Sequence, residues 1–169
     1  MKTFNKAVGR SLPTSQAQAK VTGILEFAED LQFKGLLVGR VLRSPHAHAR
    51  ITNIDVSCAR KLSGVVALIT GDDFVARYGP ALMDQPVRAR NVVRYAGEAI
   101  VAVAAEDAET AEEAIDRVKI EYEPLPAVYD AASALRADSP LVHPSMGTYE
   151  VAPGIFSRPN TNVCNHFRL

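Results

Sequence analysis

Residues 94–135 constrain the fold more than any other part of the chain, because three different hydrophobic patterns follow one another there. Residues 100–105 are a short run of Ile, Val and Ala, which is typical of a strand buried on both faces. Residues 110–118 place apolar side chains at helical spacing opposite charged ones, which predicts an amphipathic helix that packs on a sheet. Residues 118–123 alternate apolar and charged side chains up to Pro124, so we expect a half-exposed strand. The segment predicts one unit of strand, helix and strand.

The flanking segments continue this pattern. Asp130 precedes a short apolar stretch and is predicted to cap a short helix there. Upstream, the predicted elements are a strand at 36–42, an extended segment at 49–54, one or two helical turns at 57–62 and a strand at 65–69. Gly39 lies inside the first of these strands, which suggests a bulge or the close approach of another backbone. Residues 71–74 are predicted to form a turn into the start of a helix.

Composition limits the possible functions. The chain has 169 residues, 47% of them hydrophobic and 22% charged, which is ordinary for a globular protein with one core. Lys plus Arg equals Asp plus Glu at 19 each, so the net charge indicates no polyanionic partner. The sequence has no apolar run near the ~20 residues that a membrane-spanning helix needs, and its first twenty residues lack the apolar core of a signal peptide. We therefore expect a cytoplasmic protein.

Candidate reactive residues are few and isolated. Cys58 and Cys164 lie far apart in the sequence and indicate neither a disulfide framework nor a metal-binding pair. His46 and His48 would face the same way on a strand and could form half of a metal site, but no third ligand is near in sequence. We expect instead that they bond backbone groups or contact a neighbouring domain. Glu98 and the Glu106–Asp107 pair could suggest paired carboxylates for acid–base work, but we interpret them as a turn before the strand at 100–105 and a cap after it. No Gly-rich phosphate-binding loop is present in the sequence.

Several ordered motifs are similar to those of one known family. They are RSPHAHAR at 43–50, GVVALITGDD at 64–73, VRYAGE at 93–98, AAED at 104–107, YEPLP at 122–126, AKVTG at 19–23 and NVCNHFR at 162–168. Together they resemble the a/b hammerhead domain that opens the molybdopterin-binding subunit in the xanthine dehydrogenase and aldehyde oxidase family. The resemblance covers roughly residues 8–169. It implies an α+β fold in which mixed sheets and packed short helices form a single domain.

The resemblance also implies how the chain is organised. Residues 1–18 are expected to form an N-terminal arm, 19–135 the hammerhead domain, and 136–169 a loop and linker toward an absent molybdopterin-binding domain. That absent domain would hold the molybdopterin, its molybdenum and the general base, while iron–sulfur clusters and FAD would lie on partner subunits. Either the chain is truncated or another chain supplies the rest. We expect truncation, and a parent enzyme that resembles the bacterial type with separate subunits.

The implied role is scaffolding and substrate-channel shaping within a molybdenum hydroxylase, with no turnover by the isolated chain. No catalytic, cofactor-binding or metal-binding residue is predicted here. In the family, the loop before the VRYAGE strand reaches toward the substrate channel, so Leu82 and Met83 are the candidate channel residues. The alternative is a stand-alone binding or interaction module built on the same domain. A domain cut from a larger enzyme would expose an apolar patch, so we expect the isolated chain to self-associate.

Overall fold

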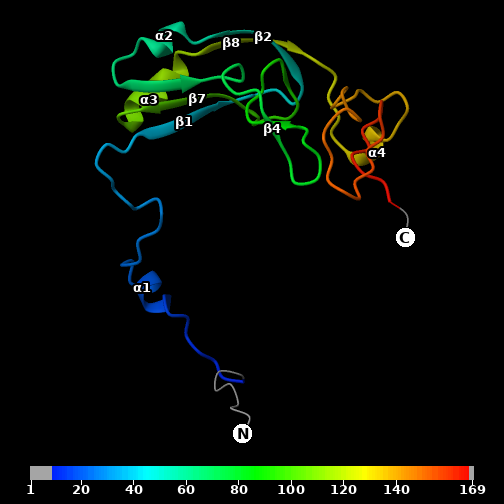
Figure 1. Ribbon diagram of the computed structural model, residues 1–169. Coiled ribbons are helices and arrows are strands. Elements are labelled where there is room, and N and C mark those ends of the chain that lie inside the picture. Colours follow the sequence, from blue (N-terminus) through cyan, green and yellow to red (C-terminus); the bar gives the residue numbers. More distant parts are fainter. Residues whose placement is uncertain (1–8, 168–169) are drawn as a thin grey trace. The chain divides into compact units, whose positions relative to one another are not determined.

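The computed structural model describes residues 9–167, which divide into two compact units. The first unit ends at Leu36 and contains one short helix, α1 (Ala17–Val21), none of whose residues is buried (Figure 1). Thr22 closes this helix by donating its backbone N–H to the carbonyl of Gln18 at 3.0 Å. The second unit begins at Leu37 and contains all the other helices and strands that the structure describes.

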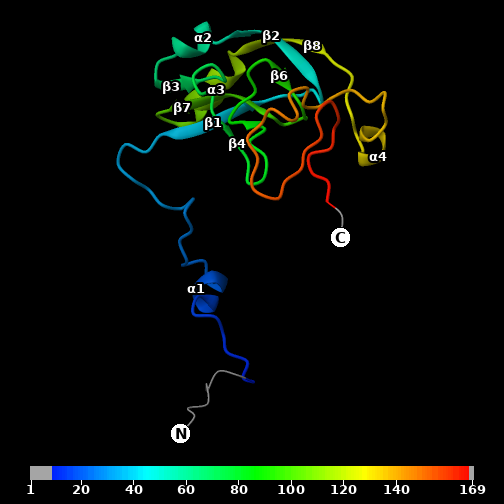
Figure 2. The same cartoon turned by 45° about the vertical axis from the view of Figure 1, so that its right-hand side comes forward.

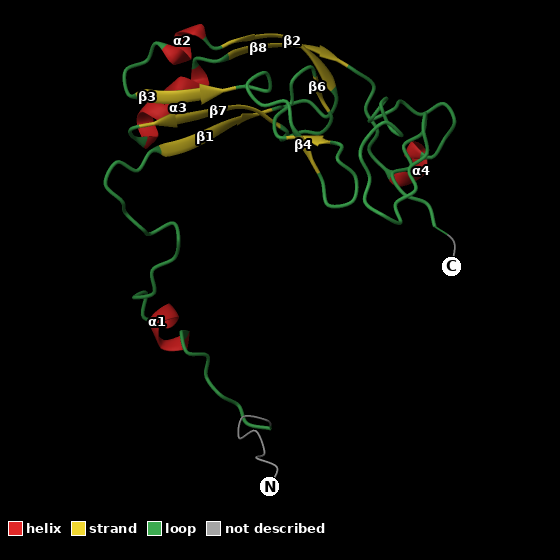
Figure 3. Ribbon diagram, viewed as in Figure 1, coloured by secondary structure: helices red, strands yellow, loops and turns green. Residues whose placement is uncertain are grey.

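Two three-stranded antiparallel sheets form the body of the second unit (Figure 3). The first has the order β1-β7-β3, with β1 (Val38–Arg43), β7 (Ala99–Ala105) and β3 (Val65–Ile69). The second has the order β6-β2-β8, with β6 (Val92–Val93), β2 (Ala49–Asp55) and β8 (Lys119–Pro124). Short helices accompany these antiparallel sheets, which confirms the predicted α+β class.

One hydrophobic core joins the two sheets and helix α3 (Ala108–Asp116). The central strand β7 contributes Ile100 and Val101, both fully buried, as the apolar run at 100–105 predicts. The second sheet contributes Ala49 and Val93, which are also fully buried, and α3 contributes Ala114. At about 25 cal/mol per Å² of apolar surface, this shared burial is the main force that holds the two sheets together.

The predicted strand, helix and strand are present as β7, α3 and β8. The two strands lie in different sheets, because β7 pairs with β1 and β3 whereas β8 pairs with β2. Helix α3 therefore carries the chain from one sheet to the other. Asp107 caps this helix, since its carboxylate accepts the Thr110 N–H at 2.7 Å. Asp130 caps α4 (Ala131–Ala134) in the same way, accepting the Ser133 N–H at 2.8 Å, as predicted.

Two local predictions are wrong. No helix follows residues 71–74; Asp73 instead accepts from the Thr70 N–H at 2.7 Å and closes a turn, after which the chain runs to β4 (Arg77–Tyr78). Gly39 pairs regularly with Ala104, and the register shift in β1 lies between Leu42 and Arg43. A Cβ on Gly39 would meet nothing closer than 4.0 Å, so neither a bulge nor a close approach explains this glycine.

The predicted short helix at 57–62 is present as α2 (Ser57–Arg60). Strand β4 pairs with β5 (Gln85–Pro86) to form a small hairpin that the sequence patterns do not predict. Residues 136–161 contain no regular strand or α-helix, yet part of this stretch packs on the hairpin. Leu82 forms an isolated antiparallel bridge with Val151, and Met146 is only 6% exposed. Figure 2 shows the segment after α4 returning beside β4.

Candidate functional site

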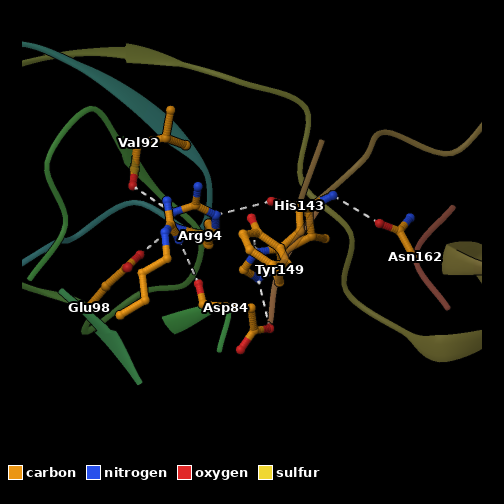
Figure 4. A network of polar contacts seen from close by, with 9 residues as sticks. Asp84, Val92, Arg94, Glu98, His143, Tyr149 and Asn162 are labelled. Atoms are coloured by element: carbon orange, nitrogen blue, oxygen red, sulfur yellow. Dashed lines mark hydrogen bonds and ion pairs between the residues drawn. The ribbon is translucent and has the colours of Figure 1, made fainter. Parts of the chain in front are cut away.

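A buried carboxylate organises the turn between β6 and β7. Glu98 is 4% exposed, and its side chain accepts the backbone N–H of Arg94 at 2.5 Å (Figure 4). Its own carbonyl accepts the N–H of Ser44 at 2.9 Å, while the Ser44 carbonyl accepts from Gly97 at 2.8 Å. These bonds join the VRYAGE turn to the RSPHAHAR segment. Burial raises the pKa of Glu98, and the bond from Arg94 acts in the opposite direction.

Arg94 ties this turn to the C-terminal segment. Its guanidinium donates to the carbonyl of Val142 at 3.2 Å and to that of Val92 at 3.3 Å. The Val142 N–H in turn donates to the side-chain oxygen of Asn162 at 2.9 Å, and the Asn162 amide donates to the Pro140 carbonyl at 2.9 Å. A continuous network therefore reaches from the start of β7 to residue 162 (Figure 4). It fixes a segment that has no regular secondary structure of its own.

His143 lies beside Arg94 between the hairpin and the C-terminal segment. Its Nε2 is 3.7 Å from an Asp84 carboxylate oxygen, and its Nδ1 is 3.2 Å from the Tyr149 hydroxyl. Burial is the main cause of the lowered pKa of His143; Arg94 lowers it further, whereas Asp84 raises it. The imidazole is therefore neutral at neutral pH. It acts here as a packing and hydrogen-bonding group that helps to hold the C-terminal segment on the hairpin.

The candidate channel residues lie at the tip of the β4–β5 hairpin and face different surroundings. Leu82 is 7% exposed, because it lies against Val151 in the bridge described above. Met83 is 38% exposed, and its backbone N–H donates to the Glu150 carbonyl at 2.9 Å. Met83 also lines an open hollow together with Val75 and Tyr149. The fold thus anchors the loop through Leu82 and leaves the Met83 side chain partly accessible.

The two histidines of the RSPHAHAR segment contact backbone and an aromatic ring. The Nδ1 atom of His48 is 2.6 Å from the carbonyl oxygen of Pro126, and the His46 ring lies 4.7 Å from that of Tyr122. Among residues 9–167, no group of three or more His, Cys, Asp or Glu side chains is placed to hold a metal ion. The helices in this part of the chain include none long and apolar enough to cross a membrane.

The fold also brings together arginines that lie far apart in the sequence. Arg50, Arg77, Arg88, Arg90 and Arg94 line one concave pocket of about 460 Å³. A smaller hollow of about 250 Å³ adjoins the hairpin and brings Glu98 and His143 together with Tyr95. The only signal in the sequence is the run of arginines at positions 88, 90 and 94. Local spacing could not show that Arg50 and Arg77 join them.

Comparison with known proteins identifies the family. Residues 7–126 match the family model described as "Aldehyde oxidase and xanthine dehydrogenase, a/b hammerhead domain". The chain belongs to this family. It is 41% identical over 128 residues to a probable xanthine dehydrogenase subunit of Bacillus subtilis, a match that covers 75% of this chain and 17% of the relative. It is 34% identical over 151 residues to the nicotinate dehydrogenase large molybdopterin subunit of Eubacterium barkeri, covering 86% and 35% of the two chains.

Solved structures show the same hammerhead fold. The reconstituted CO dehydrogenase from Oligotropha carboxidovorans superposes with a TM-score of 0.71 at 35% identity, over 79% of this chain and 17% of that one. The aldehyde oxidoreductase from Desulfovibrio gigas superposes with a TM-score of 0.70 at 28% identity, over 85% and 17%. This hammerhead chain therefore spans less than half of the length of the relatives described here, and it matches part of their molybdopterin or large subunits.

Proposed function

We propose that this chain is the hammerhead portion of a molybdenum hydroxylase large subunit, where it scaffolds the enzyme and shapes the entrance of the substrate channel. The family match over residues 7–126 carries this proposal. Molybdopterin, held by a molybdopterin-binding domain outside this chain, would supply the oxidation chemistry, and iron–sulfur and FAD subunits would take up the electrons. The proposed compartment is the cytoplasm.

The network around Arg94 and Glu98 supports a scaffolding role. Arg94 bonds the C-terminal segment at Val142, and the bridge between Leu82 and Val151 joins that segment to the tip of the β4–β5 hairpin. A rigid support of this kind keeps a substrate-facing side chain in place, as positioning groups in enzymes require. Met83 is the candidate side chain for this task, because it is exposed whereas its neighbour Leu82 is buried.

A domain exchange tests the scaffold. The part of this chain that aligns with the nicotine 6-hydroxylase large subunit of Paenarthrobacter nicotinovorans, 35% identical over 139 residues, would replace the matching region of that subunit. We expect the chimaera to assemble with molybdenum and to hydroxylate nicotine. The isolated chain should neither retain molybdenum nor reduce a dye in the presence of the substrate. A chimaera that folds but does not assemble would favour a stand-alone binding module instead.

The channel role is tested in the same chimaera. Met83→Ala should change KM for nicotine by roughly tenfold, since removing an apolar wall group alters substrate binding by about that factor. Val66→Ala is the matched control, because Val66 is 57% exposed on β3 and lies outside the hairpin. Equal KM values for the Met83 variant and the control would exclude Met83 from the channel. They would leave the scaffold role unaffected.

A further inference from the structure

The arginine pocket is locally positive, which the overall composition does not show. The chain has zero net charge, yet the pocket is lined by five arginines and by no Asp or Glu: Arg50, Arg77, Arg88, Arg90 and Arg94. They come from β2, from β4, from the stretch that connects β5 to β6 and from the turn that follows β6. The clustering is therefore a product of the tertiary fold. Such a concentration of one sign in a concave site raises the local concentration of anions.

Three of these arginines form no direct ion pair among residues 9–167, although Asp73 and Glu98 interact electrostatically with Arg88 and Arg94. Arg50 pairs with Glu123 at 3.1 Å and Arg90 pairs with Asp72, but both pairs are largely exposed and contribute little. The Arg94 guanidinium donates only to backbone carbonyls. Arg77 donates to the Asp84 carbonyl and lies over the Tyr149 ring. Among the described residues, Arg88 forms no ion pair or hydrogen bond through its side chain. The pocket thus retains positive charge that an anion could neutralise.

The other walls of the pocket are apolar. Phe74 and Val75 are 52% and 71% exposed, and Leu125 and Leu141 contribute to the same surface. An exposed aromatic ring beside free guanidinium groups suits a ligand with an anionic head and an apolar body. The volume of about 460 Å³ leaves room for such a body beside the head group.

We propose that this pocket binds an organic phosphate, with the phosphate held by Arg88, Arg77 and Arg94 and the organic body against Phe74. Guanidinium groups match the geometry of phosphate oxygens and can donate two bonds to one group, and a phosphate dianion offers more charge than a single carboxylate. The arginines line one concave pocket of about 460 Å³, a size that suits a small ligand. The chain also has no basic excess of the kind that nucleic-acid-binding proteins show. The inference does not depend on the proposed role in a molybdenum enzyme.

Calorimetric titration of the full chain at low salt tests the site, with phenyl phosphate as the probe and inorganic phosphate, benzoate and phenol as comparisons. Phenyl phosphate should bind about tenfold more tightly than inorganic phosphate, because the ring removes apolar surface from water. Arg88→Gln should weaken it by about tenfold or more through the loss of a charge-assisted contact. Arg117→Gln, on the turn that ends α3, is the charge-matched control and should leave the affinity within about twofold.

The proposal would be overturned if phenyl phosphate did not bind or if inorganic phosphate bound as tightly as phenyl phosphate. It would also be overturned if Arg117→Gln reduced the affinity as much as Arg88→Gln does. Benzoate binding as tightly as phenyl phosphate would also overturn it. That result would identify a binding site for carboxylates, such as those of an acidic segment of a protein partner. Chemical-shift mapping on the unmodified chain provides a second measurement if the Arg88 variant does not fold. The shifts should centre on Arg88, Arg94 and Phe74; shifts centred elsewhere would exclude this pocket.

Discussion

Glu98 is a buried acid whose pKa is raised by burial above its usual value of 4.5. The folded state therefore binds its proton more tightly than the unfolded state does. The resulting stabilisation is fully present below pH 4.5 and is lost as the pH rises through the folded-state pKa. At neutral pH the fold is therefore less stable with an ionised Glu98 than it would be with a neutral side chain at this position.

Glu98→Gln should consequently be at least as stable as the unmodified chain at pH 7.5, because a neutral amide can still accept the Arg94 N–H. The difference in free energy of unfolding between the two proteins should shrink as the pH falls toward 4.5. Glu98→Ala, which leaves that N–H without its acceptor, should cost about 1–3 kcal/mol. Urea denaturation of the three proteins at several pH values measures these differences.

The comparison between variants also removes the contribution of His143. The lowered pKa of His143 has the opposite effect, since its stabilisation is lost as the pH falls through 6.5 toward the folded-state value. This contribution is common to all three proteins and cancels in the difference. A Glu98→Gln variant that is markedly less stable at pH 7.5 than at pH 5, relative to the unmodified chain, would show that Glu98 works as an ion.

Single residues are predictable from sequence only where their partners are close along the chain. Asp107 and Asp130 each bond a group three residues ahead, so the local pattern is sufficient. The prediction for Gly39 is wrong, whereas a close approach that local patterns do not predict occurs at Gly71, where a Cβ would lie 2.7 Å from the Ala89 carbonyl oxygen. Ala89 is eighteen residues further along the chain, and no local pattern brings the two together. The arginine pocket is not predictable for the same reason, since its residues lie far apart in the sequence.

At the scale of elements, α3 depends on its N-cap. Asp107 accepts both the N–H and the hydroxyl of Thr110, and the cap bond lowers the pKa of its carboxyl. Asp107→Ala should lower the melting temperature by roughly 2–4 °C, because the first turn of the helix loses an acceptor. Asp116→Ala is the matched control at the other end of α3. There a carboxylate is unfavourable to the helix dipole, so its loss should leave stability unchanged or slightly higher.

Thermal unfolding followed by circular dichroism measures both variants. Equal destabilisation by the two substitutions would mean that the cap bond contributes nothing specific. The result bears on the whole body of the domain, since α3 packs on the first sheet and leads directly into β8 of the second.

Most elements are predictable because each has its own hydrophobic period. The apolar run of β7, the helical spacing of α3 and the alternation of β8 all appear within the segment that forms the element. Which sheet each strand joins is not predictable in this way, since pairing connects residues such as Ala49 and Pro124 that lie far apart in sequence. The hairpin of β4 and β5 escapes prediction because strands of two residues have no period to detect.

At the scale of the whole molecule, the composition and the ordered motifs are sufficient for the family and the fold class. The motifs retain their order across the chain, and the match over residues 7–126 confirms the resemblance. The way in which residues 141–152 pack on the hairpin is not predictable from local patterns. It depends on the contacts of Arg94 and Leu82 with residues about fifty or more positions away.

The remaining prediction concerns self-association of the isolated chain. Large hydrophobic side chains are exposed throughout residues 12–36, among them Ile24 at 76%, Phe27 at 57% and Phe33 at 65%. Exposed apolar groups this close together favour association, since burying them removes apolar surface from water. We expect light scattering to show dimers or larger species whose proportion rises with concentration.

Phe27→Ser combined with Phe33→Ser should shift the population toward monomer. Tyr129→Ser, which changes an aromatic side chain that is 83% exposed in the second unit, should not. A chain that stays monomeric at every concentration, or an equal effect of the Tyr129 control, would contradict this role for the N-terminal apolar residues.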